Sequence, residues 1–363
     1  MNRNLLRSAA PLAVAVTLAL GLSACGAANE TPSSGDSSKL SGTLNAGGAS
    51  SQESAIAAWK KAFQTTNPGT TINYDPIGSG GGREQFIAGG LNLVGSDAFL
   101  DDEELAKAKT QCKSDIVEVP VYVSPVAIIF NLPGVTDLNL TPEVVGGIFE
   151  GKIKTWDAAA IKADNPDAKL PSTRISPVHR SDDSGTTENF TDYLDQASNG
   201  SWTGGKDKVW PVKSGEAAAG TSGVVSAVTK GEGTIGYADA SQAGALSVAK
   251  IKVGDEFVAY SPEAAAAVLD ASKQVEGRSE TDIAINVDRK ISAAGVYPIV
   301  LVSYQIACEK YADKAQADLV KSWLTYVASS AGQAVAAKDA GAAPLSADLS
   351  TKVTAAIAKI TVS

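Results

Sequence analysis

Apolar residues recur at helical spacing in several segments of the chain. Ile56, Trp59 and Phe63 fall at positions i, i+3 and i+7, which places them on one face of a helix over residues 54–66. A second helix is expected to begin at Arg83, after a run of glycines. Further helices are expected at residues 138–149, 185–194, 315–328 and 350–360.

Short β-rich runs lie between these helices. The predicted strands are residues 72–74, 174–178, 231–237 and 299–307. A longer β-rich run over 117–130 is interrupted by Pro120 and Pro125, which suits a crossing between two domains. The alternation of strands and helices indicates an α/β fold.

Composition adds the expected size and the charge. The chain has 363 residues, and at roughly 150 residues per domain this length favours two domains. Hydrophobic residues make up 44% and charged residues 20%, as in ordinary globular proteins. The formal net charge is -9, so the overall field does not attract nucleic acid. Any anion that binds must therefore be held by a local arrangement of donors.

The first residues have the pattern of an exported protein. Residues 1–24 resemble a signal peptide, with a basic start and an apolar stretch that is short for a membrane span. The run Leu-Ser-Ala-Cys at 22–25 resembles a bacterial lipobox, so we expect lipid on Cys25 and a flexible tether over 25–39. The chain would then be anchored to the outer face of the cytoplasmic membrane. The alternative is an ordinary cleaved signal with an incidental cysteine.

The remaining cysteines form an even pair. If Cys25 carries lipid, Cys112 and Cys308 are left, and a disulfide between them is expected in an exported protein. Two buried free thiols are the alternative. His179 is the only histidine and no Cys-x-x-Cys occurs, so we expect neither a metal site nor a cofactor.

Three segments combine small and hydroxyl residues immediately before a helix. They are residues 47–51, residues 78–82 and residues 179–187. A helix N-terminus presents unpaired N–H groups and a partial positive charge, which suits an anion. Small polar residues before a helix are more often simple caps and turns, so each segment alone is a weak signal.

The third segment is the most specific of the three. Arg180 can donate two parallel hydrogen bonds to an oxyanion, and Asp182 can fix its guanidinium. Ser184 and Thr186 add hydroxyls, and the backbone at Gly185 can approach a ligand closely. The alternative is a surface loop with an ion pair of little consequence.

Asp97 ends an apolar stretch. A carboxylate in an anion site is unexpected, because like charges repel. It can accept a hydrogen bond from the P–OH of phosphate, whereas fully ionised sulfate offers no such proton. A buried charge left unpaired is costly, so discrimination between the two anions can be strong. The alternative is that Asp97 caps the helix that starts near Asp101.

Several runs together resemble one known family, the phosphate-binding lipoproteins of bacterial ABC phosphate importers. The runs lie at residues 74–82, 95–98, 151–157, 180–187, 233–237 and 297–299. The resemblance covers nearly all of the chain after the tether. It implies a periplasmic-binding-protein fold, in which two α/β domains joined by hinge strands close over the ligand in the cleft. The first domain would comprise residues 40–119 and 297–363, and the second residues 120–296.

The resemblance also implies a ligand set and a physiological partner. Phosphate would be held by Ser50, Ser51, Ser79, Asp97, Arg180, Ser184, Gly185 and Thr186, with Asp182 supporting the arginine and Asp97 accepting the phosphate proton. The protein would act as a monomer and pass phosphate to the permease subunits of an importer. The family's first loop often has Thr-Phe-Pro where this chain has Ser50, Ser51 and Gln52, so this loop departs from the family pattern.

Two other function classes compete with phosphate delivery. A hydrolase acting through Ser184 or Ser79 needs a base, but His179 points to the opposite side of an extended strand from Arg180. We therefore expect no enzymatic activity. A receptor for another oxyanion such as sulfate, or a phosphate-sensing lipoprotein, is the remaining alternative, and Asp97 argues for a protonated anion.

Overall fold

The computed structural model describes residues 40–363, apart from the side chain of Asp270. The predicted signal peptide, the lipidated Cys25 and the tether lie outside the described residues. Within residues 40–363, none of the helices is both long enough and apolar enough to cross a membrane.

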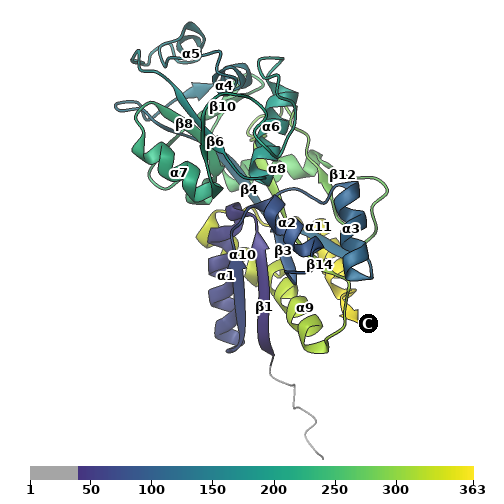
Figure 1. Cartoon of the computed structure of the whole chain (residues 1–363). Helices are drawn as coiled ribbons and strands as arrows, with labels where there is room; N and C mark the ends of the chain where they lie inside the picture. The colour runs from purple at the N-terminus through teal and green to yellow at the C-terminus, as the bar shows by residue number, and fades with distance from the viewer. Residues whose placement is uncertain (1–39) are drawn as a thin grey trace, which may run out of the picture. The chain divides into compact units, whose positions relative to one another are not determined.

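A mixed sheet runs through the fold in the order β2-β1-β3-β14-β4-β8-β6-β7, and β9 also pairs with β4. Figure 1 labels β1, β3, β14, β4, β8 and β6 of this sheet. Its strands are β1 Ser41–Gly48, β2 Gly69–Asp75, β3 Leu93–Ser96, β4 Ile116–Asn131, β6 Ser176–Arg180, β7 Glu216–Ala218, β8 Thr234–Asp239, β9 Ser247–Val248 and β14 Val300–Cys308. β1 is parallel to β2 and β3, and β6 is parallel to β7 and β8. β14 is antiparallel to β3 and β4, and β4 is antiparallel to β8.

Shorter strands pair outside this sheet. β5 Asn139–Leu140, β10 Lys250–Val253 and β11 Glu256–Val258 form one group, and β12 Lys273–Gln274 with β13 Ile285–Asn286 and β15 Lys310–Tyr311 with β16 Thr361–Val362 form two pairs. The helices are α1 Glu53–Thr66, α2 Ser79–Ile87, α3 Asp102–Cys112, α4 Pro142–Phe149, α5 Ala159–Asp164, α6 Gly185–Ala197, α7 Gly220–Lys230, α8 Pro262–Ala271, α9 Lys314–Ala328, α10 Ser330–Ala340 and α11 Ala347–Ala358. Two 3-10 turns, η1 Ser50–Gln52 and η2 Ala240–Gln242, complete the set.

β4 is shared by both halves of the sheet. Its residues 116–125 pair with β14, and its residues 126–131 pair with β8. We call the half containing β1, β2 and β3 the first lobe, and the half containing β6, β7 and β8 the second lobe. Pro120 and Pro125 lie within β4, as the interrupted β-rich run predicted, and this strand passes from one lobe to the other.

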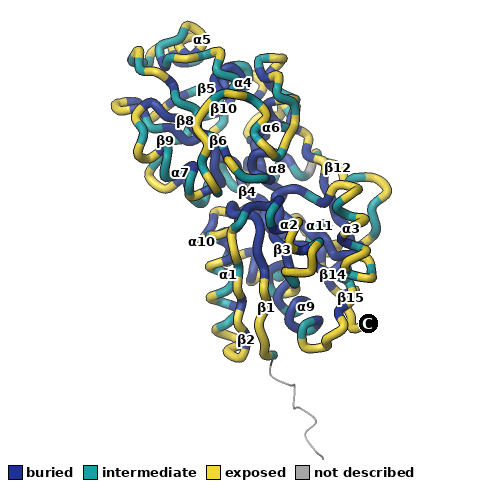
Figure 2. Tube along the Cα trace, in the orientation of Figure 1, coloured by how far each residue is buried: buried dark blue, intermediate teal, exposed yellow. Residues whose placement is uncertain are grey.

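Each lobe has its own aromatic core. In the first lobe, Phe63 of α1 packs edge-on against Trp323 of α9, with 5.3 Å between ring centroids. In the second lobe, Phe190 of α6 stacks on Tyr237 of β8 at 4.3 Å. β4 and β14 are buried along nearly their whole length between these cores (Figure 2).

A third apolar cluster involves a segment that we assigned to the second domain. Ala265 and Val268 of α8, with Ile285 of β13, pack beside Phe86 and Val94 of the first lobe. This part of the chain therefore contributes to the first-lobe side of the fold. The boundaries at residues 119, 120, 296 and 297 themselves stay a prediction.

Most predicted elements occur close to their expected positions. The helix over 54–66 is α1, and the helix over 315–328 is α9. Several boundaries differ. The helix expected from Arg83 begins at Ser79, the strand expected at 174–178 is β6 at Ser176–Arg180, and the helix expected at 138–149 begins only at Pro142, after β5. The strand expected at 231–237 is β8 at Thr234–Asp239, and the helix expected at 350–360 is α11 at Ala347–Ala358.

The glycines of α2 belong to the helix because the backbone there meets other segments closely. A Cβ added at Gly82 would lie 2.5 Å from the Cα of Gly48, and one at Gly80 would lie 2.4 Å from the Cβ of Asp183. Glycine is a poor helix former, and tertiary packing overrides that preference here.

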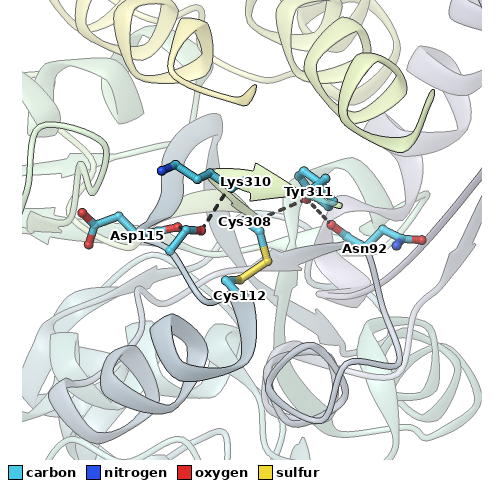
Figure 3. The surroundings of a disulfide bond; sticks show 7 residues. Asn92, Cys112, Asp115, Cys308, Lys310 and Tyr311 are labelled. Atoms are coloured by element: carbon cyan, nitrogen blue, oxygen red, sulfur yellow. Dashed lines mark hydrogen bonds between the residues drawn. A yellow bond between two sulfur atoms is a disulfide. The ribbon is translucent and has the colours of Figure 1, made fainter. Parts of the chain in front are cut away.

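Cys112 and Cys308 form a disulfide that joins the end of α3 to the end of β14 (Figure 3). The hydroxyl of Tyr311 lies beside this bond, where it accepts a hydrogen bond from the Cys308 amide at 3.1 Å and donates to the Asn92 carbonyl at 2.8 Å. The bridge ties two segments of the first lobe that are 196 residues apart in the chain.

Candidate anion-binding site

The site lies where strands of both lobes end in turns that start helices. β1 leads into η1, β2 leads into α2, and β6 leads into α6. β1 and β2 are parallel, with Gly47 opposite Asp75, so their carboxyl ends meet at one edge of the sheet. The first two turns need glycine: the φ angles are 126° at Gly48 and 89° at Gly78.

Asp97, which directly follows β3, is the centre of this site and is only 3% exposed. Its Oδ1 atom accepts hydrogen bonds from the hydroxyls of Ser51 and Ser303, each at 2.6 Å. Its Oδ2 atom accepts one from the hydroxyl of Thr186 at 2.9 Å. Its backbone N–H donates to the Ser79 hydroxyl at 3.1 Å. Residues from both lobes therefore converge on one buried carboxylate.

The alternative role for Asp97, as the cap of the next helix, is wrong. Asp101 caps α3: its Oδ1 atom accepts from the Glu104 amide at 2.8 Å, and Glu104 accepts in return from the Asp101 amide at 3.1 Å. This reciprocal arrangement satisfies the N-terminus of α3 without Asp97.

Arg180 and Asp182 form a two-point pair. The Nε atom of Arg180 donates to Oδ1 of Asp182 at 2.8 Å, and an Nη atom donates to Oδ2. Burial alone would raise the pKa of Asp182, but the hydrogen bond and charge of Arg180 lower that pKa below its usual value. Arg180 is only 2% exposed, so the alternative of a solvated surface loop does not hold.

The N-terminus of α6 faces the first lobe. Ser184 caps this helix, and its hydroxyl accepts from the Thr187 amide at 3.2 Å. A Cβ added at Gly185 would lie 2.7 Å from the Cβ of Asp97 and 2.8 Å from the Ser79 hydroxyl, so only glycine permits this approach. Free N–H groups at this helix end can bind an anion.

Ser50 is buried, but its contacts are with Thr221 and Gln242 of the second lobe rather than with Asp97. Its hydroxyl accepts from the Thr221 amide and shares a hydrogen bond with the Thr221 hydroxyl, both at 3.0 Å, at the N-terminus of α7. Its carbonyl accepts from the Gln242 side chain at 2.8 Å. Of the predicted ligands, Ser51, Ser79, Gly185 and Thr186 therefore lie directly around Asp97, while Ser50 connects the first turn to the second lobe.

Three polar residues of this site, Gln52, Asn189 and Ser303, were not among the predicted site residues. Ser303 lies on β14, and Gln52 donates to the Ser303 hydroxyl at 2.7 Å. The side-chain amide of Asn189 donates to the carbonyls of Asp97 at 2.7 Å and Gly185 at 2.8 Å. The available signal was weak: Ser303 is a hydroxyl in a mostly apolar strand run, and Asn189 lies two residues after the third segment, about one helical turn beyond Gly185.

A charged group bridges the lobes beside the site. Arg83, only 1% exposed, is 3.1 Å from Glu104 of the same lobe and 3.6 Å from Asp183 of the second lobe. Lys208 of the second lobe is 3.1 Å from Glu104 and 3.4 Å from Asp183. Charges of opposite sign therefore alternate across the contact between lobes.

Arg289 makes a second connection to α6. Its guanidinium donates to Asp192 at 3.0 Å, to Asn189, and to the carbonyls of Pro298 at 3.0 Å and Val300 at 2.9 Å. Because Asn189 in turn holds the Asp97 carbonyl, Arg289 links the start of β14 to the centre of the site.

His179 faces away from the Arg180 side chain, as expected. Its ring stacks on Trp210 with 4.7 Å between centroids, and burial lowers its pKa. Its Nδ1 atom lies 2.8 Å from the Arg180 carbonyl oxygen. This position leaves the imidazole packed on an aromatic ring rather than beside a site hydroxyl.

Comparison with known proteins places the chain among binding proteins. A family model described as the PBP superfamily domain matches residues 33–331. Phosphate-binding protein PstS 3 of Mycobacterium leprae is 38% identical over 311 residues, which is 83% of this chain and 83% of that protein. Phosphate-binding protein PstS 3 of Mycobacterium tuberculosis strain H37Rv is 35% identical over 333 residues, or 88% and 90% of the two chains.

A solved structure agrees with these sequence matches. A high-affinity periplasmic phosphate-binding protein, PfluDING bound with phosphate, superposes with a TM-score of 0.73 at 25% identity. The match covers 86% of this chain and 93% of that one. The predicted periplasmic-binding-protein fold is therefore confirmed.

Proposed function

Because the chain belongs to the PstS family of phosphate-binding proteins, within the PBP superfamily, we propose that it binds inorganic phosphate with high affinity and delivers it to an ABC phosphate importer. The observation that carries this proposal is the buried Asp97, to which hydroxyls of both lobes donate. Among residues 40–363, the side-chain partners of the Asp97 carboxylate are the hydroxyls of Ser51, Thr186 and Ser303.

The residues of the site have separate roles in this proposal. Arg180, oriented by Asp182, supplies the positive charge and two parallel donors to the phosphate oxygens. The N–H groups at the starts of η1, α2 and α6 donate to the remaining oxygens. The proposed ligands are Ser50, Ser51, Ser79, Asp97, Arg180, Ser184, Gly185 and Thr186.

Asp97 selects the protonation state of the anion. Phosphate near neutral pH carries at least one P–OH group, which can donate to the carboxylate. Sulfate carries none, so its oxygens would face a buried carboxylate without a proton between them, and that arrangement is costly. Selectivity for phosphate over sulfate follows from this single residue.

The working place of the protein is outside the cytoplasmic membrane, where its relatives' periplasmic fold operates. We propose lipid on Cys25 as the anchor and permease subunits of an importer as the partners. All the proposed ligands come from one chain, so a monomer is sufficient to bind phosphate. The relatives are named as binding proteins, which supports a role without catalysis.

Titration calorimetry tests this function. Residues 41–363, freed of bound phosphate, should bind phosphate tightly with one site per chain, and sulfate weakly. Arg180→Ala should abolish tight phosphate binding, and Arg180→Lys should restore it only in part, because a lysine cannot donate two parallel hydrogen bonds. Asp97→Asn should reduce the difference in binding affinity between phosphate and sulfate. Equal binding of phosphate and sulfate by the unmutated protein would favour a general oxyanion receptor, and binding of neither would contradict the proposal.

A further inference from the structure

Gln52 is a fully buried amide in the turn that starts α1. It is 0% exposed, and its nitrogen is 2.7 Å from the Ser303 hydroxyl and 2.9 Å from the Tyr304 carbonyl oxygen. The two contacts fall on β14, 251 and 252 residues further along the chain. Gln52 therefore connects the first binding turn to the strand that pairs with both β3 and β4.

The direction of these hydrogen bonds is determined by chemistry. A backbone carbonyl only accepts, so the amide group that faces Tyr304 must be the NH₂ group of Gln52. The same nitrogen then donates to Ser303. Because the Ser303 oxygen already receives a proton there, its own proton goes to an acceptor, and Asp97 at 2.6 Å is closer than the Ser96 carbonyl at 3.4 Å.

The space for the amide depends on a neighbouring glycine. A Cβ added at Gly95 would lie 2.9 Å from the Oε1 atom of Gln52. That oxygen is buried and has no hydrogen-bond partner among the described residues. A buried polar atom without a partner lowers stability. An apolar side chain would therefore suit the packing better, and the amide needs a reason beyond packing.

We propose that Gln52 is a specificity-determining positioning residue, which acts through Ser303 to keep a hydroxyl proton directed at Asp97. This inference rests on the proposed function and concerns the same ligand class, protonated tetrahedral oxyanions. Gln52 does not touch the ligand. Its effect is to decide which way the Ser303 hydroxyl points.

Through Ser303, Gln52 determines how many acceptor positions on Asp97 remain for the ligand. An ionised carboxylate has about four lone-pair positions, and the hydroxyls of Ser51, Ser303 and Thr186 use three of them. The Oδ1 atom receives two donors and the Oδ2 atom one, which leaves one position for a proton from the ligand. Without Gln52, the Ser303 hydroxyl is free to turn toward Ser96, and the carboxylate of Asp97 loses a donor. Loss of a hydrogen bond to the charged form favours the neutral carboxyl, and a neutral carboxyl can donate to an anion that carries no proton, so discrimination against sulfate falls.

Four variants of the chain test this inference by calorimetry with phosphate, and with sulfate in competition against phosphate. Gln52→Met keeps the length of the side chain and removes the donor. Phosphate affinity should fall roughly tenfold, as for the loss of a donor to a charged group, and the preference for phosphate over sulfate should fall by a similar factor. Ser303→Ala should cause the same two losses.

The double variant Gln52→Met/Ser303→Ala should bind phosphate no more weakly than Ser303→Ala, because Gln52 acts through that hydroxyl. Gln333→Met is the matched control. Gln333 is a buried glutamine that donates to the carbonyls of Val121 and Val327, and its loss should change both affinities less than twofold.

Additive losses in the double variant, or an equal loss for phosphate and sulfate in Gln52→Met, would overturn the inference, since either outcome indicates general loosening. So would unchanged binding in Gln52→Met by a folded protein, as judged from its thermal transition. Those results would leave the proposed function intact. The proposed function fails separately, if the unmutated chain itself does not bind phosphate.

Discussion

Thr186 of the second lobe donates a hydrogen bond of 2.9 Å to Asp97 of the first lobe. The two residues are 89 positions apart in the chain, and both are almost fully buried. The contact exists only because the neighbouring residue, Gly185, lets the start of α6 approach Asp97 and Ser79. The site is thus complete only with both lobes in contact.

Gly185→Ala should weaken phosphate binding at least tenfold. The added methyl group would lie 2.7 Å from the Asp97 Cβ, so the lobes could not reach this arrangement without a shift. Calorimetry gives the affinity, and small-angle scattering with saturating phosphate shows whether the chain still closes. Gly223→Ala is the control, because a Cβ there meets its nearest neighbour at 3.6 Å. Wild-type affinity in Gly185→Ala would show that this close approach is unnecessary.

Lys208→Met should weaken phosphate binding about two- to fivefold, because it removes one of the charges that bridge Glu104 and Asp183. Lys208 is 34% exposed, so solvent screens the pair and the effect stays within about 1 kcal/mol. The affinity of the unmutated protein should also fall more steeply with added potassium chloride than that of the variant. Lys162→Met removes an exposed ion pair within the second lobe. It should change neither the phosphate affinity nor the dependence of that affinity on salt. Identical salt dependence in the Lys208 variant and wild type would contradict a bridging role.

Asp239 should make the stability of the protein depend on pH. Burial raises the pKa of Asp239 to about 7 in the folded chain, whereas an unfolded aspartate has a pKa of about 4. Between these values the unfolded chain has released the proton and the folded chain still holds it. The free energy of unfolding therefore falls as pH rises from about 4 to 7, by at most about 4 kcal/mol from this group.

Asp239→Asn should remove this contribution, so urea unfolding at pH 5 and pH 8 should differ less in the variant than in wild type. The side chain accepts hydrogen bonds from the Tyr122 hydroxyl at 2.9 Å and the Ser241 amide at 3.0 Å, which an asparagine oxygen can keep. Asp137→Asn, at an exposed aspartate paired with Lys250, controls for a general charge effect. If the free energy of unfolding changed equally with pH in Asp239→Asn and wild type, Asp239 would not be the cause of the pH dependence.

Removal of the disulfide should lower the free energy of unfolding by about 2–5 kcal/mol, because the bridge closes a long loop in the unfolded chain. The double substitution Cys112→Ser/Cys308→Ser keeps similar side-chain size, and urea unfolding measures the loss. Phosphate affinity should change less than twofold, since both cysteines lie at the ends of first-lobe elements and outside the group around Asp97. A large loss of affinity at unchanged stability would show that the bridge shapes the site.

Local pattern was enough to predict the elements that carry the site. The spacing of Ile56, Trp59 and Phe63 predicted α1, because a helix that buries one face needs that period. The third segment was identified from Arg180, whose neighbours form the cap and first turn of α6. The helix expected from Arg83 began four residues too late, because the close packing that admits glycine into α2 comes from β1 and the Asp183 turn.

The amino-acid order thus specified the helices, the strand that joins the lobes, and three turns suited to an anion, because each of these follows from residues near one another in the chain. Tertiary structure alone decided that Asp97 is a shared acceptor rather than a helix cap, and that Gln52 and Ser303 serve it. Hydrogen bonds are short and directional, and those partners are separated by 206 and 251 residues. Only the folded chain brings such groups within 3 Å of one another.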